Sequence, residues 1–339
     1  MRRATILRLL GVVLLIGVGA YSAYWWIAAD RIKLGAANWA QAAQARQLDV
    51  SWQTIRVAGY PFAFRLELGD AVLADKAVNP PVEVRAPALS ASILPWDFDA
   101  VRLAAPSGIS ALFGPDTARL ARIDAAAATG AVAAAKDGGT AIWLTLSQPT
   151  AEAGATVSAR AADAWVILPP RVPAEHAETG LAVAALVNGL TIPAAPPELG
   201  TTIEQLGFGV TLTGGLPNGS PKEALARWRD AGGTLALDHL DLRWGALGVT
   251  GSGTLSLDPD LQPVGGISGA ISGYDQLMNA LVAAGRLKAS DARVARLALA
   301  MMGRVGPDGR PSISTALRIQ DGELFLGPAK LGRVPRIEW

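Results

Sequence analysis

Residues 55–70 read IRVAGYPFAFRLELGD, a Gly-Tyr-Pro-Phe turn followed by a segment with an apolar residue at every second position. The apolar side chains of one parity are Phe62, Phe64, Leu66 and Leu68. Arg65 and Glu67 fall on the other parity, and successive side chains of a β-strand point to opposite faces of the sheet. The stretch therefore predicts a strand with one polar and one apolar face, entered at a corner that Tyr60-Pro61 marks.

The same alternation recurs through most of the chain after residue 50. Apolar positions that follow it are Leu206, Phe208, Val210, Leu212, Leu235, Leu237, Leu240, Leu242, Trp244, Leu247, Val249, Leu255 and Leu257. The phase changes at Asp238-His239, which predicts a β-bulge or bend at these two residues. Turn-forming stretches such as GLPNGS at 215–220 separate the runs. The pattern predicts a mainly β (α+β) fold, an extended and curved antiparallel β-sheet with a few helices.

Helical spacing of apolar residues is confined to a few segments. Helices are predicted at residues 220–231, 273–287 and 290–303. The first begins with Ser220, a good capping residue, and Glu223 completes a capping box. Residues 117–136 and 179–192 fit either a helix or a strand, and the neighbouring turns favour a strand for both.

The N-terminal segment LLGVVLLIGVGAYSAYWWIAA, residues 9–29, carries no charge over 21 residues. A helix rises about 1.5 Å per residue, so about 20 apolar residues cross the hydrocarbon core of a bilayer. The preceding tail, residues 1–8, contains Arg2, Arg3 and Arg8, which favour a cytoplasmic N-terminus. Aromatic residues gather near the far end of the span, as at membrane interfaces. The interface residues predicted from this are Tyr24, Trp25 and Trp26.

Residues 9–29 are therefore predicted to be an uncleaved single-pass transmembrane anchor in a bacterial inner membrane. The alternative is a signal peptide cleaved after Val18-Gly19-Ala20, but the apolar run continues through two tryptophans beyond this point. On either interpretation the rest of the chain lies in the periplasm. Residues 30–47 are predicted to form a helical stalk. Residues 48–339 are predicted to form a β-rich periplasmic domain, with a sub-boundary near 190–200.

The charge balance and the residue content exclude several classes of function. The chain has 339 residues, with 30 Lys plus Arg against 29 Asp plus Glu and a net charge of +1. Phosphate binding needs a strongly basic face, so nucleic acid is not an expected partner. The absence of cysteine excludes disulfides, thiolate metal sites and cysteine nucleophiles.

The sequence carries no recognisable catalytic or metal-binding motif. Its histidines, His176 and His239, form no HxH or HxxxH pair, and no G-x-S-x-G elbow is present. A dyad of His239 with Asp238 or Asp241 is conceivable, but a histidine at the surface or in a turn is the more common case. We therefore expect no enzyme activity, no metal and no cofactor.

Several stretches together resemble a known bacterial family. They are YWWIAADRIK, VSWQTIRVAGYPFAFRLELGDAVL, ALSASILPWDFDAVRLAAP, WGALGVTGSGTLSLDPD and LRIQDGELFLGPAKLG. In this order they resemble the uncharacterised family called domain of unknown function 2125, which is found in alphaproteobacteria. More distantly, the anchor and the GSGTLSLD hairpin are similar to the AsmA-like envelope proteins. That resemblance implies a periplasmic, β-rich protein whose curved sheet guides lipids or assists outer-membrane assembly, and it brings no catalytic residues.

Two interpretations of the apolar strand faces remain open. Either helices and a second layer cover them as a closed core, or part of them lines a groove that holds an acyl chain. The residues predicted for such a lipid groove are Phe62, Phe64, Leu66, Phe208, Val210, Val249 and Leu255. The first hypothesis is therefore a membrane-anchored periplasmic protein that binds lipid or another apolar envelope component. The alternatives are an assembly or interaction factor for envelope proteins, with a closed core, and a periplasmic hydrolase.

Overall fold

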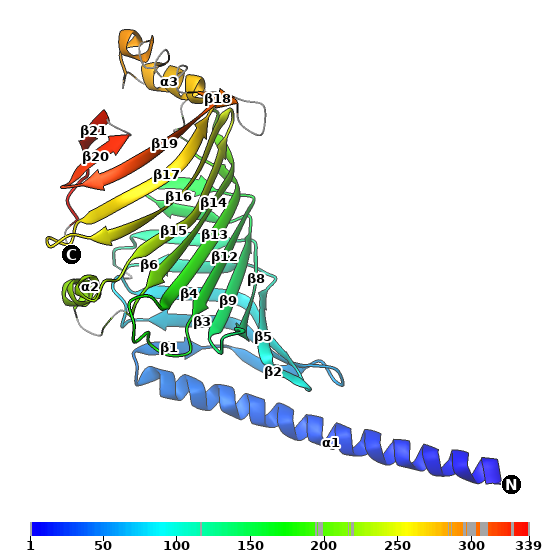
Figure 1. Ribbon diagram of the computed structural model, residues 1–339. Helices are drawn as coiled ribbons and strands as arrows, with labels where there is room; N and C mark the ends of the chain where they lie inside the picture. The colour runs from blue at the N-terminus through cyan, green and yellow to red at the C-terminus, as the bar shows by residue number, and fades with distance from the viewer. Residues whose placement is uncertain are drawn as a thin grey trace. The chain divides into compact units, whose positions relative to one another are not determined.

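The computed structural model describes most of the chain. The described residues are 2–115, 117–193, 195, 199–215, 217, 220–283, 285, 287–293, 296, 303–305, 311–326 and 329–337. The chain divides into two compact units, Met1–Ala131 (unit 1) and Val132–Trp339 (unit 2). This division lies well before the sub-boundary predicted near residues 190–200. The fold is mainly β, as predicted, with antiparallel strands, a few helices and an apolar N-terminal helix (Figure 1).

Unit 1 consists of one long helix and a set of antiparallel strands. Its elements are α1 (Arg2–Gln44), β1 (Leu48–Ser51), β2 (Thr54–Ala58), β3 (Phe64–Asp75), β4 (Val82–Leu94), β5 (Asp97–Ala105), β6 (Ile109–Phe113) and β7 (Ala121–Ala125). β8 (Ala127–Ala134) crosses the boundary between the units. β3 pairs with β1 and β2 on one side and with β4 on the other, and β4 continues to β5 and β6. The predicted anchor lies on α1, as do residues 2–8 of the predicted tail and residues 30–44 of the predicted stalk, whereas residues 45–47 form a turn.

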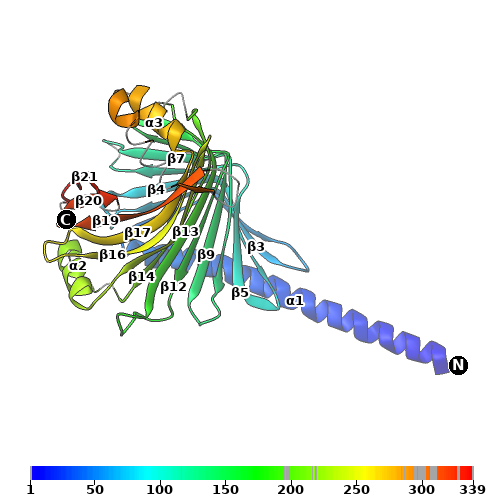
Figure 2. The same ribbon diagram turned by 45° about the horizontal axis from the view of Figure 1, so that its top comes forward.

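Unit 2 is built around a curved run of antiparallel strands, visible in Figure 2. The strands are β9 (Thr140–Ser147), β10 (Thr150–Ala153), β11 (Ala155–Ser158), β12 (Ala161–Leu168), β13 (Thr179–Thr191), β14 (Thr202–Thr213), β15 (Leu235–Trp244), β16 (Leu247–Leu257), β17 (Pro263–Ser272), β18 (Arg304–Val305), β19 (Pro311–Gln320), β20 (Glu323–Leu326) and β21 (Ala329–Arg333). The pairing order is β9, β12, β13, β14, β15, β16, β17, β19, β20, β21.

Two helices connect strands of unit 2 at opposite ends of the sheet. α2 (Pro221–Asp230) follows β14, and α3 (Tyr274–Ala283) follows β17. The start of α2 agrees with the predicted cap, because the Glu223 amide donates a hydrogen bond to Ser220 Oγ at 3.4 Å. α3 confirms a helix within 273–287. Most of the helix predicted for 290–303 lies outside the described residues, although residues 289–293 are helical.

Other strand predictions agree with the structure, except that Phe62, predicted on the strand, lies in the turn before β3. The two ambiguous segments form strands, since β7 and β8 fall within 117–136 and β13 occupies Thr179–Thr191. The bulge predicted at Asp238-His239 is confirmed by a register shift in the pairing of β15 with β14 and with β16. The bulge has a packing consequence, because it lets Leu237 and Leu240 point to the same face although they are three positions apart.

Candidate functional site

The apolar side chains of unit 2 line up in rows across its strands. Residues directly paired in antiparallel strands point to the same face of the sheet, so the register assigns each side chain to a face. Phe208 pairs with Ala185 on β13 and with Leu240 on β15. Val210 pairs with Val183 in the same way. Both predicted residues of β14 therefore lie on one apolar face.

Three consecutive rows on this face cross β9, β12, β13, β14, β15, β16, β17 and β19 in that order. The first row is Leu146, Ala162, Val187, Leu206, Leu242, Val249, Ile271 and Ile313. The second row is Leu144, Ala164, Ala185, Phe208, Leu240, Gly251, Gly269 and Thr315. The third row is Ile142, Val166, Val183, Val210, Leu237, Gly253, Ile267 and Leu317. We call these three rows the apolar face; they contain no charged residue.

The apolar face is only partly covered. Among its residues Ile313 alone is buried, whereas Phe208, Val210 and their neighbours are half-buried and Leu144 is exposed. The coverage that exists comes from α3 at the first row, where Leu277 and Ala280 pack in one cluster with Val249. A closed core would bury the middle rows as well. Leu255, one row beyond the third, pairs with Leu235 and is also half-buried.

The other three predicted lipid-binding residues lie in unit 1, in three different environments. Phe64 is buried, and its ring stacks on the Trp25 ring of α1 with the ring centroids 5.5 Å apart. Leu66 is half-buried and pairs with Val57 of β2. Phe62 lies in the turn before β3 and is 71% exposed. Phe64 is therefore not accessible to a ligand while α1 is in place.

α1 is fastened to this turn by its aromatic residues. The Trp25 indole Nε1 donates a hydrogen bond to the Ala63 carbonyl at 3.3 Å, and the Tyr21 hydroxyl donates to the Pro61 carbonyl. Trp25 is only 1% exposed, while its predicted companions at a membrane interface, Tyr24 and Trp26, are 49% and 61% exposed. Trp25 therefore packs against the sheet, and Tyr24 and Trp26 remain available to the surroundings.

The polar residues considered for catalysis lie on the opposite face of unit 2. His239 is exposed and lies across Gly209, and Thr211 Oγ1 donates a hydrogen bond to Asp238 Oδ2 at 2.7 Å. A shallow depression of about 530 Å³ runs past these residues, and the Asp241 Oδ1 atom in it is buried without a hydrogen-bond partner. Within the described part of the chain, no three or more His, Asp or Glu residues gather as metal ligands.

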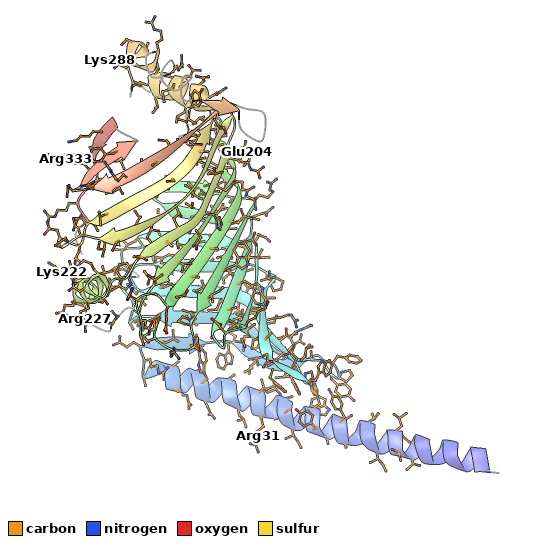
Figure 3. The ribbon with its side chains drawn as sticks, viewed as in Figure 1. Arg31, Glu204, Lys222, Arg227, Lys288 and Arg333 are labelled. Carbon is orange, nitrogen blue, oxygen red and sulfur yellow. The ribbon has the colours of Figure 1, made fainter. Side chains whose placement is uncertain are left out.

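A second depression, of about 640 Å³, lies beside α2 and is lined by charged side chains. They include Lys222 on α2, labelled in Figure 3, together with Arg229, Asp260 and Arg336. Arg229 donates hydrogen bonds to the carbonyls of Asp258 and Pro259, at 3.0 and 2.8 Å. The Arg229 guanidinium therefore stabilises the β16–β17 turn, which is a structural role.

Among the residues that the structure describes, the carboxyl of Asp124 has a perturbed pKa. Arg122 donates two hydrogen bonds to the Asp124 carboxylate, at 2.5 and 2.8 Å, and these lower the pKa of Asp124 below its ordinary value. Ser110 on the neighbouring strand adds a further hydrogen bond, while partial burial opposes the shift. The group lies on paired strands β6 and β7, where it links neighbouring side chains.

Part of this site is visible in the sequence pattern. The alternation predicted Phe208, Val210, Val249 and Leu255, but their cross-strand partners, such as Val183, Leu240 and Ile267, were not predicted. The alternation was visible in those segments, but only the strand register shows which side chains share a face.

Comparison with known protein families places this chain. The model of the family described as "Uncharacterized protein conserved in bacteria (DUF2125)" matches residues 25–335. No curated protein and no solved structure matches this chain.

Proposed function

We propose that this chain, which belongs to the DUF2125 family of uncharacterised bacterial proteins, is a membrane-anchored, non-catalytic binding protein of the cell envelope. Its ligand is a lipid or another apolar envelope component, held along the apolar face of unit 2. The anchor is α1, and the strands lie in the periplasm.

The apolar face is the observation that carries this proposal. Its three rows are uncharged over their whole length, and their middle residues, Phe208 and Val210 among them, are only half-buried. Large uncovered apolar surfaces on proteins mark ligand grooves or docking sites. A long uncharged face on which Thr315 is the one polar side chain suits an acyl chain, because an acyl chain makes apolar contacts along its length and no hydrogen bonds.

The membrane anchor rests on the length and composition of α1. Its described part contains one segment, within Gly11–Gln44, that is long and apolar enough to cross a bilayer. The contacts of Tyr21 and Trp25 with the β2–β3 turn favour an anchor that is retained, because cleavage after Ala20 would leave these residues at a new, frayed N-terminus. The arginines of residues 1–8 favour a cytoplasmic N-terminus and therefore a periplasmic domain.

A photocrosslinking experiment tests the ligand. In the full chain, produced in its native envelope, Phe208 is replaced by a photoreactive phenylalanine analogue, and adducts are identified by mass spectrometry. The matched control carries the analogue at Ser252, which is exposed on the opposite face of β16. The proposal expects lipid adducts at position 208 and few at position 252. Equal yields at both positions, or protein adducts alone at 208, would contradict it.

A second candidate function, docking to another envelope protein, is favoured by one observation. Trp143 of β9 and Trp165 of β12 are directly paired, and the two rings are 40% and 43% exposed. Paired exposed tryptophans are common anchors of protein interfaces. The same photoreactive analogue at Trp165 tests this role, since a defined protein adduct there would support it and its absence would remove it.

A further inference from the structure

Two hairpin tips of unit 1 expose aromatic side chains at the same end of the sheet. In the β2–β3 turn Tyr60 is 45% and Phe62 is 71% exposed, and at the β4–β5 tip Trp96 is 65% and Phe98 is 61% exposed. β3 and β4 are antiparallel and Phe64 pairs with Ile93, so the turn before β3 and the turn after β4 are neighbours. Large aromatics on loop tips are costly in water unless something apolar receives them.

α1 is attached to this same end of the sheet. Trp25 is buried against Phe64, and Ile93 packs on the cluster that these two residues form with Ala29. Further toward the C-terminus of α1, Ala40 and Ala43 are also buried, where the helix contacts β1. The segment predicted to be a stalk is therefore packed on unit 1 and is not a free spacer.

The length of α1 sets where the bilayer must lie. The part of the uncharged run that precedes the contacts with the turn is 9–20, or 12 residues, which spans only about 18 Å as a helix. The hydrocarbon core is about 30 Å thick, so these residues alone are too short to cross it. A helix that crosses the bilayer therefore uses the whole run to residue 29. Tyr21 and Trp25, which are hydrogen-bonded to the β2–β3 turn, then lie within the membrane-spanning segment.

We propose that the two hairpin tips enter the bilayer beside α1. Tyr60, Phe62, Trp96 and Phe98 lie at the level of the lipid headgroups and the adjoining acyl chains, where aromatic side chains are favoured. The anchor is thus a composite of one helix and two β-turns, and unit 1 rests on the membrane surface. Charged residues resume at Asp30 and Arg31, and Arg31 points away from the strands into solvent (Figure 3). This inference rests on the proposed membrane anchor.

The chain has no cysteine, so a single introduced cysteine reports on one position. Four variants of the full chain, Phe62→Cys, Trp96→Cys, Leu14→Cys and Val78→Cys, carry an environment-sensitive fluorophore. Each is reconstituted in vesicles of phosphatidylethanolamine and phosphatidylglycerol. Quenching is measured with lipids that bear a nitroxide near the headgroup or deeper in the acyl chain.

Leu14 on α1 reports the anchor itself, and Val78 in the β3–β4 turn is the matched control. Val78 is 44% exposed and follows β3 at the end opposite to Phe64. The 12 residues of β3 separate these two ends by about 36 Å. Positions 14 and 78 are therefore the references for positions 62 and 96. All four side chains are exposed, so we expect their replacement to leave the fold intact. Circular dichroism confirms the fold of each variant.

The proposal expects strong quenching by nitroxide lipid at positions 62 and 96, at least about twofold above that at position 78. Quenching at position 14 with none at 62 and 96 would retain the anchor and overturn the composite arrangement. No quenching at position 14 would overturn the anchor and with it the inference. Equal quenching at 62, 96 and 78 would also contradict the proposal, because it would show general adsorption of unit 1 rather than insertion of its tips.

Discussion

Replacing Phe64 by alanine removes the ring on which α1 is seated. Phe64 is 3% exposed, stacks on Trp25 with an interplanar angle of 18° and meets the Tyr24 ring at a centroid distance of 6.4 Å. Truncation of a buried phenylalanine costs about 3–5 kcal/mol. Because α1 can move partly into the vacated space, we expect a destabilisation at the low end of this range, about 3 kcal/mol. This corresponds to a factor of about 150 in the equilibrium constant for local opening of β2 and β3.

The matched control is Phe62→Ala, two residues away and 71% exposed, which we expect to change the stability by less than about 0.5 kcal/mol. Hydrogen exchange followed by mass spectrometry, on the full chain in mild detergent, resolves the effect to peptides that cover β2 and β3. We expect exchange there to accelerate by about two orders of magnitude in Phe64→Ala. An acceleration below about threefold, or equal effects of the two variants, would refute the packing argument.

Three further substitutions test individual contacts. Asp124→Asn removes the carboxylate paired with Arg122 on an exposed strand, so we expect a loss of at most about 1 kcal/mol at neutral pH. Folding lowers the pKa of Asp124, so its carboxylate contributes to the free energy of unfolding above the unfolded pKa of 3.8, and this contribution is lost as the pH falls through the native pKa. Urea melts of the natural chain and of Asp124→Asn should therefore converge at acid pH. Ser220→Ala removes the N-cap of α2 and should destabilise the helix by about 1 kcal/mol, measured as faster amide hydrogen exchange within α2. Ser220→Asp keeps a capping side chain and should retain the slow exchange of the natural chain. Trp228→Phe removes the hydrogen bond from Trp228 Nε1 to the Thr213 carbonyl at 2.7 Å. We expect thermal melts to show a free energy of unfolding lower by about 1–3 kcal/mol, and an unchanged melt would contradict this role of Trp228.

The strand pattern could be read from the sequence because it is local. Phe208 and Val210 alternate with small or polar residues, and the break in phase at Asp238-His239 marks the bulge. The start of α2 was equally local, since Ser220 makes its capping bond three residues away. Such features depend on neighbours within a few positions, which composition and spacing describe directly.

The environment of each apolar residue could not be predicted, because it depends on partners distant in sequence. Phe62 and Phe64 have the same parity, yet Phe62 is exposed in a turn and Phe64 is buried under Trp25, which lies 39 positions earlier. Val249 was grouped with Phe208, but Val249 packs in a cluster with Leu277 and Ala280 of α3, which are distant in the sequence, although both residues are half-buried. Register and helix placement decide these outcomes, and neither is visible in the hydrophobic period alone.

The central claim is that the apolar face of unit 2 holds lipid, and lipid content of the purified protein tests it most directly. The full chain is purified from its native envelope in mild detergent, and bound lipid is quantified by mass spectrometry for the natural sequence, Phe208→Glu and Ser252→Glu. The two variants carry the same new charge on opposite faces of the sheet. We predict stoichiometric lipid on the natural sequence and on Ser252→Glu, and its loss from folded Phe208→Glu. A natural protein that is folded and free of lipid, or equal lipid on all three chains, would contradict the account.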